Sequence, residues 1–101
     1  MMVMDAFDWL QQWYREQCDG DWEHAYRVRI STLDNPGWSL DVNLAETDWD
    51  NLTLPIQSIR RSEDDWLDYW VKDQRFGGAC GPVNLMELIE AFRRIVEGEQ
   101  A

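Results

Sequence analysis

Hydrophobic residues recur every three or four positions between residues 5 and 19, which is the spacing of one face of an α-helix. These positions are Ala6, Trp9, Leu10, Trp13, Tyr14 and Cys18. Asp5 can cap the N-terminus of such a helix, and Gly20 can end it. The pattern therefore predicts a helix over residues 5–19, and we interpret Trp9 and Trp13 as core residues that pack against a sheet.

The period changes to two in the next segment, where hydrophobic and polar residues alternate over 26–32 and again over 38–44. The connection Leu33-Asp34-Asn35-Pro36-Gly37 is rich in turn-forming residues. The two runs predict an antiparallel hairpin with strands over about 25–33 and 38–45. In the expected register Thr32 lies opposite Trp38 and Val28 opposite Val42, and each strand buries one face.

A polar loop around Trp49 is expected over 45–53, followed by a third strand over 54–61. Pro55 has no N–H group to give to a neighbouring strand, so it predicts an edge position or a bulge. Residues 66–73 fit both a helical and an alternating pattern, and their aromatic content favours a fourth strand.

The segment 76–82 contains three glycines and a proline, which predicts a flexible connection. Residues 84–97 then show a helical stripe, with Asn84 and Glu87 spaced as a capping box. The order of elements predicts a single α+β domain over residues 1–101. In this domain an N-terminal and a C-terminal helix pack on a four-stranded antiparallel sheet.

Composition narrows the function classes. The chain carries 9 Lys and Arg residues against 20 Asp and Glu, a formal net charge of −11, which argues against a nucleic-acid-binding protein. Its 45% hydrophobic residues argue against disorder. The N-terminus lacks the basic and apolar regions of a signal peptide, and no apolar run is long enough to span a membrane, so we expect a cytoplasmic protein with free thiols.

Candidate catalytic chemistry is sparse. His24 is the only histidine, and its spacing from Cys18 gives little support for a catalytic pair. Cys80 lies in Gly-Gly-Ala-Cys-Gly-Pro, a setting that could activate a thiol in a small sulfur-transfer enzyme, although a glycine-rich turn is the simpler interpretation. The acidic residues match no calcium loop and the cysteines no zinc site, so no catalytic residue, metal or cofactor is predicted.

Acidic residues instead cluster beside tryptophans, at Trp22, Trp49 and Trp66. Aromatic residues surrounded by carboxylates suit a basic protein partner, although the carboxylates alone could serve solubility. The candidate partner-binding residues are Trp22, Glu23, Asp34, Trp38, Asp48, Trp49, Asp50, Asp64, Asp65 and Trp66. Trp38 could instead lie in the core, because it is in phase with Leu40 and Val42.

One run of residues resembles a known family. Trp22-Glu23-His24 followed by Thr32-Leu33-Asp34-Asn35-Pro36-Gly37-Trp38 is similar to the immunity protein 53 family of bacterial polymorphic toxin systems. Further similarity extends from Trp9 to the helix that begins near Asn84. Arg27 departs from the family pattern, in which a glycine commonly follows the tyrosine of the first strand.

The resemblance implies a protein that binds and neutralises a cognate toxin, and no catalytic residue is carried over from the family, so we expect a non-enzymatic inhibitor. The sequence leaves both a monomer and a homodimer open. The charge of −11 adds the hypothesis that the toxin is a basic nuclease. Neither nucleic acid nor a membrane is expected as a partner.

Overall fold

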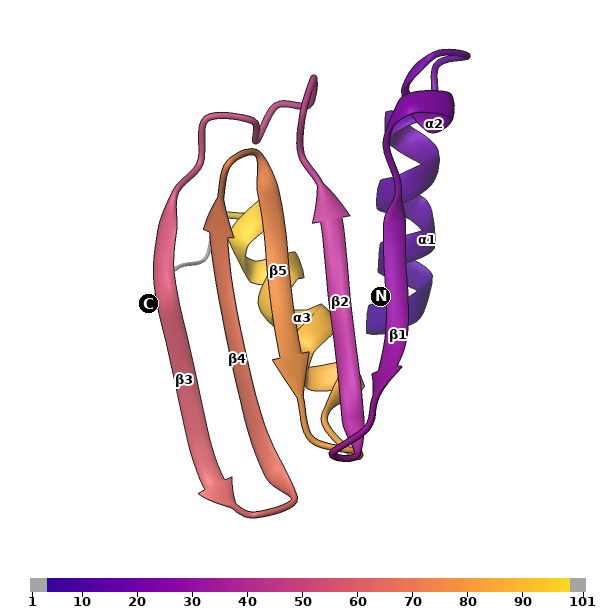
Figure 1. The fold of residues 1–101 in the computed structure, drawn as a ribbon. Coiled ribbons are helices and arrows are strands. Elements are labelled where there is room, and N and C mark those ends of the chain that lie inside the picture. Colours follow the sequence, from indigo (N-terminus) through magenta and orange to yellow (C-terminus); the bar gives the residue numbers. More distant parts are fainter. Residues whose placement is uncertain (1–3, 99–101) are drawn as a thin grey trace.

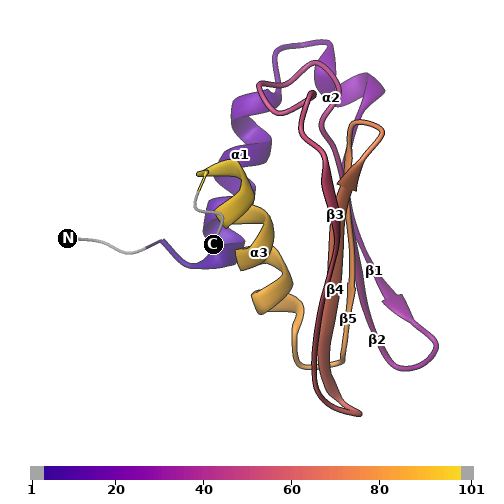
Figure 2. The same ribbon diagram turned by 90° about the vertical axis from the view of Figure 1, so that its left-hand side faces the viewer.

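The computed structural model describes residues 4–98 and contains a five-stranded antiparallel sheet with helices on one face (Figures 1 and 2). The elements in chain order are α1 (Ala6–Gln17), α2 (Trp22–Ala25), β1 (Val28–Leu33), β2 (Gly37–Asn43), β3 (Leu54–Ser62), β4 (Asp65–Lys72), β5 (Arg75–Cys80) and α3 (Leu85–Val96). The strand order is β1-β2-β5-β4-β3, so the last strand of the chain occupies the centre.

The α+β class is correct, but the predicted four strands and the flexible segment 76–82 are wrong. β5 pairs with β2 on one side and β4 on the other. Its glycines are buried, and each makes room for a side chain on a different face. A Cβ atom on Gly77 would lie 2.6 Å from the Trp70 ring, and one on Gly78 would lie 2.6 Å from Leu88. These glycines allow side chains to pack closely against a strand. In the sequence alone, a glycine-rich segment with this role cannot be distinguished from a turn.

The predicted hairpin register is confirmed, since Thr32 pairs with Trp38, Ile30 with Leu40 and Val28 with Val42. β1 begins later than predicted, because residues 22–25 form the short helix α2. The burial prediction holds for β2 but fails for β1, in which Ile30 is 37% exposed. β1 is an edge strand, so its side chains have neighbours on one side only.

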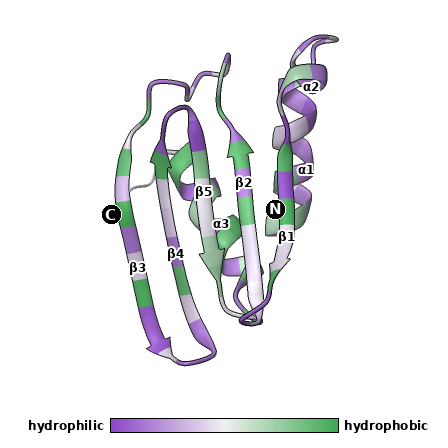
Figure 3. Ribbon diagram, in the orientation of Figure 1, coloured by the Kyte–Doolittle hydropathy of each residue, from purple (hydrophilic) through white to green (hydrophobic). Residues whose placement is uncertain are grey.

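Residues 66–72 form a strand as predicted, within β4, and Asp73 begins the turn to β5. β3 is the other edge of the sheet, as Pro55 indicated, and its register with β4 shifts between Leu54 and Gln57 and again between Arg60 and Ser62. Hydrophobic and hydrophilic residues alternate along β2 and β4 (Figure 3). The hydrophobic set, which includes Leu40 and Val71, faces the helices.

Phe92 of α3 lies at the centre of the core. Its ring centroid is 4.9 Å from that of Phe76 on β5 and 5.1 Å from that of Trp13 on α1. Trp9 also contacts Phe92, at 5.6 Å. Trp9 and Trp13 are therefore packing residues, as the sequence predicts, and the aromatic partner that they share, Phe92, belongs to α3. The Asp5 cap is confirmed by a 2.8 Å hydrogen bond from the Asp8 N–H to the Asp5 carboxylate.

No helix within residues 4–98 combines the length and the apolar composition needed to cross a bilayer.

Candidate functional site

The ten candidate residues lie at two opposite ends of the sheet (Figure 1). The upper end of Figure 1, at the α1–α2 and β2–β3 connections, carries Trp22, Glu23, Asp48, Trp49 and Asp50. The lower end, at the β1–β2, β3–β4 and β5–α3 connections, carries Asp34, Trp38, Asp64, Asp65 and Trp66. The candidates therefore form two separate groups, which must be considered independently.

Two segments far apart in sequence are joined at the upper end. The indole N–H of Trp22 donates to the Ala45 carbonyl at 2.9 Å, and the Tyr26 hydroxyl donates to the Glu46 carboxylate at 3.0 Å. We call the acidic residues of these segments the acidic rim: Asp19, Asp21, Glu23, Glu46, Asp48 and Asp50. These contacts fix the two halves of the rim relative to each other.

The tryptophans of the upper end lie beneath the rim and pack on the core. Trp22 is only 4% exposed, and its ring centroid is 6.2 Å from that of Trp13. Trp49 is half-buried, lies 5.8 Å from Trp13, and donates its indole N–H to the Val96 carbonyl at 3.1 Å. Both side chains hold the loops to the helices, and this leaves the carboxylates as the groups that the rim presents to solvent.

The rim carboxylates have no Lys, Arg or His ion-pair partner among the residues that the structure describes. Asp19 accepts hydrogen bonds from the backbone N–H groups of Trp22 and Asp21, both at 2.9 Å, and these bonds lower its pKa. Glu23 accepts from the N–H groups of Asp19 and Gly20, at 3.0 Å each. The hydrogen bonds to Asp19 favour its ionised carboxylate. Six acidic side chains without a cation among them concentrate negative charge at the rim.

The lower end differs in its electrostatics, because two of its carboxylates, those of Asp65 and Glu87, are paired with a cation. The Arg61 guanidinium contacts the carboxylates of Asp65, at 2.9 Å, and Glu87. The buried Asn84 side chain donates to Asp65 at 2.8 Å and to Glu87 at 3.1 Å. Hydrogen bonds from Arg61, and to a lesser degree from Asn84, hold the pKa values of both carboxyls below their usual range.

This network also corrects the predicted capping box. Asn84 precedes α3, but its side chain makes no capping hydrogen bond to the helix. Its carbonyl oxygen instead accepts from the Trp66 N–H of β4 at 3.3 Å. Asn84 therefore ties the start of α3 to the sheet.

Trp66 and Trp38 lie on opposite faces at the lower end. Trp38 is on the helix side, half-buried against the core, with its indole N–H donated to the Pro82 carbonyl at 3.1 Å. This position agrees with the alternative that Trp38 lies in the core, in phase with Leu40 and Val42. Trp66 is on the face that no helix covers, with the Arg60 guanidinium 4.8 Å from its ring centroid. Asp34 and Asp64 lie in exposed turns.

The uncovered face of the sheet is locally basic. It carries Arg29, Arg60, Lys72 and Arg75, which are four of the nine cationic residues of the chain. Asp41 and Asp68 are its carboxylates. Asp68 is paired with Arg60 at 2.8 Å and Asp41 with Arg75 at 3.7 Å, which leaves Arg29 and Lys72 as its excess of positive charge. A basic partner would therefore meet repulsion on this face and attraction at the acidic rim.

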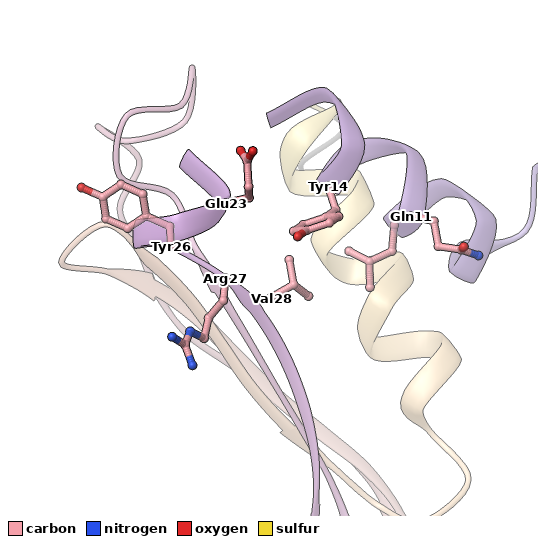
Figure 4. A pocket seen from close by; sticks show the side chains of 7 residues that line it. Gln11, Tyr14, Glu23, Tyr26, Arg27 and Val28 are labelled. Atoms are coloured by element: carbon pink, nitrogen blue, oxygen red, sulfur yellow. The ribbon is translucent and has the colours of Figure 1, made fainter. Parts of the chain in front are cut away.

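A hollow of about 420 Å³ lies directly beside the acidic rim, between α1 and the start of β1 (Figure 4). It is lined by Leu10, Gln11, Tyr14, Glu23, Tyr26, Arg27 and Val28. Val28 points towards Tyr14 across the gap, whereas Arg27 points away from it (Figure 4). The hollow has no signature in the sequence, because Tyr14 and Val28 each satisfy a core pattern and only the separation between α1 and β1 leaves them partly uncovered.

The two cysteines are free thiols, as expected. Cys80 is fully buried, and burial raises its pKa to about 11. Roughly one Cys80 thiol in 10,000 would then be ionised at neutral pH, which argues against the alternative of a thiol enzyme. Cys18 donates its thiol hydrogen to the Tyr14 carbonyl at 3.3 Å. Residues 4–98 bring together no group of three or more His, Cys, Asp and Glu side chains that could hold a metal ion.

The fold and this surface define a small acidic α+β protein with a charged rim beside an open hollow. The family model of immunity protein 53 matches residues 7–97, and the chain therefore belongs to the immunity protein 53 family. No curated protein and no solved structure matches the chain.

Proposed function

We propose that this protein binds and neutralises a cognate bacterial toxin through the acidic rim. Membership of the immunity protein 53 family supports a toxin as the partner. The observation that carries the choice of surface is the set of rim carboxylates, which two hydrogen-bonded loops present and which have no cationic partner within residues 4–98. Inhibition by binding requires no nucleophile or cofactor.

A basic nuclease is the toxin class that this surface fits best. Enzymes that act on nucleic acids use cationic surfaces to bind phosphate groups. Carboxylates held at fixed positions can pair with the same Arg and Lys side chains and so exclude the substrate. Electrostatic attraction between the rim and such a surface also accelerates association.

Charge reversal at the two ends tests this proposal. The toxin is first recovered from the source cells with the tagged chain as bait, and its identity is established by toxicity that co-expression of the chain suppresses. In Asp48→Lys/Asp50→Lys, we expect the association rate constant to fall by about tenfold or more at low salt, with unchanged thermal unfolding. The reduction should shrink as salt rises, because salt screens the interaction.

Glu63→Lys/Asp64→Lys is the matched control, because it makes the same change of charge in the exposed β3–β4 turn. We expect this variant to lose less than about threefold of the rate. Equal losses in both variants would assign the effect to net charge alone and remove the rim from the interface. A toxin that binds with salt-independent kinetics would contradict the nuclease class.

A further inference from the structure

The two edges of the sheet differ in their ability to accept another strand. β3 contains Pro55 and two register shifts, features that disfavour pairing with a further strand. β1 pairs with β2 in an unbroken register from Val28 to Leu33 and contains no proline. β1 is therefore the edge at which the sheet can be extended.

The register identifies which backbone groups of β1 are free. Asn43 donates its N–H to the Arg27 carbonyl at 3.1 Å, which places this pair among the hydrogen-bonded positions. Hydrogen-bonded and non-hydrogen-bonded pairs alternate in an antiparallel ladder. The N–H and C=O groups of Val28, Ile30 and Thr32 must then point away from β2, towards the free edge. All three residues are uncharged and β-branched, which favours strand pairing.

The same three side chains face the helix side of the sheet, because their partners Val42, Leu40 and Trp38 do so. α1 packs mainly on α3 and leaves the hollow above the start of β1. Tyr14 is 39% exposed and Ile30 is 37% exposed, so apolar surface is available beside the free backbone groups. An edge strand facing a helix across an open groove is the arrangement that binds extended peptides by strand addition.

We infer that β1 accepts an extended segment of the toxin as a sixth strand of the sheet. This inference rests on the proposed function and specifies where the toxin binds. The segment places an uncharged side chain in the hollow between Tyr14 and Val28, and a basic side chain near Glu23 at the rim end of the hollow. Glu23 lines the hollow and belongs to the acidic rim, so one continuous surface offers backbone pairing and charge complementarity.

A second copy of the chain is the competing occupant. Self-pairing would bring together two chains that each carry a net charge of −11, whereas a basic segment complements that charge. Charge therefore favours the toxin over a homodimer at this edge.

Proline substitution tests strand addition directly. The Ile30 N–H points to the free edge, so Ile30→Pro removes a donor for the added strand without removing a hydrogen bond to β2. We expect affinity for the recovered toxin to fall by about tenfold or more. Ile56→Pro is the matched control, because Ile56 lies on the other edge in the irregular stretch between Leu54 and Gln57. Its affinity should stay within about twofold of the unsubstituted chain.

Hydrogen exchange of the unsubstituted complex gives a second measurement that does not depend on how Ile30→Pro folds. We expect the amides of Val28, Ile30 and Thr32 to become protected when the toxin is added. If the toxin binds and is neutralised but these amides stay unprotected, strand addition is wrong and the proposed function stands. If the toxin neither binds nor is neutralised, the proposed function itself fails. Protection that rises with the concentration of the chain alone would assign the edge to a homodimer and overturn the inference.

Discussion

The two ends of the sheet carry similar acid–tryptophan sequences and use them differently. Asp48-Trp49-Asp50 at the upper end packs its half-buried tryptophan against the core, and its carboxylates have no cationic partner in the part of the chain that the structure describes. Asp64-Asp65-Trp66 at the lower end places its tryptophan on the uncovered face and ties Asp65 to Arg61 and Asn84. The difference shows that the cations and amides within reach decide whether an acidic side chain is tied into the fold or left unpaired.

At the lower end, ion pairs and hydrogen bonds contribute differently to stability. Salt bridges at exposed positions contribute little, typically up to about 1 kcal/mol, so the Arg61 pairs alone do not hold the lower end together. The buried Asn84 side chain contributes more, because its loss would leave the part-buried Trp66 N–H without its acceptor and a gap where the amide is packed. The lower end should therefore be sensitive to changes that the upper end tolerates.

The largest expected effect is that of Asn84→Ala. The substitution removes the amide that bridges Asp65, Glu87 and the Trp66 N–H, so we expect the free energy of unfolding to fall by about 2–3 kcal/mol. Urea denaturation measures this loss. Asn51→Ala, in the exposed β2–β3 connection, is the control and should change stability by less than about 0.5 kcal/mol. A loss of similar size in both variants would contradict the contrast between the ends.

A smaller loss is expected for Trp22→Phe, which keeps an aromatic ring but removes the indole N–H bonded to the Ala45 carbonyl. We expect a loss of about 1 kcal/mol in the same denaturation experiment. The substitution also releases one contact between the two halves of the acidic rim, so toxin association should slow. Unchanged association would show that the rim keeps its arrangement without this hydrogen bond.

The smallest effect concerns pH. Asp65 and Glu87 have pKa values lowered in the folded state, chiefly by hydrogen bonds from Arg61. Their contribution to stability is therefore complete above the ordinary carboxyl pKa values, near pH 4, and is lost as pH falls through the lowered values. Arg61→Met should flatten this acid-induced decrease in thermal unfolding temperature. An equally steep decrease in the variant would assign acid sensitivity to other carboxyls.

The elements that could be predicted from the sequence are those in which burial of one face produces a regular hydrophobic pattern. Alternation over 26–32 and 38–44 predicted the hairpin and its register, because one face of β2 is buried and a shift of one residue would expose it. Helical spacing predicted α1 and α3 for the same reason. These elements are defined by neighbours close in sequence or by burial of a single face.

The missed features depend on contacts between distant segments. Gly77 and Gly78 carry no hydrophobic pattern, and their place in β5 follows from Trp70 and Leu88, which pack against them. The acidic rim likewise depends on the hydrogen bond between Trp22 and Ala45. The spacing of residues within one segment cannot predict contacts with a distant segment.

The central position of β5 has a consequence for how the protein is made. During synthesis the β1–β2 and β3–β4 hairpins emerge first, and each lacks the strand that joins it to the other. An isolated two-stranded hairpin is at best marginally stable in water. The sheet can therefore form cooperatively only after residues 75–80 have left the ribosome, so the chain cannot adopt this fold until its synthesis is nearly complete.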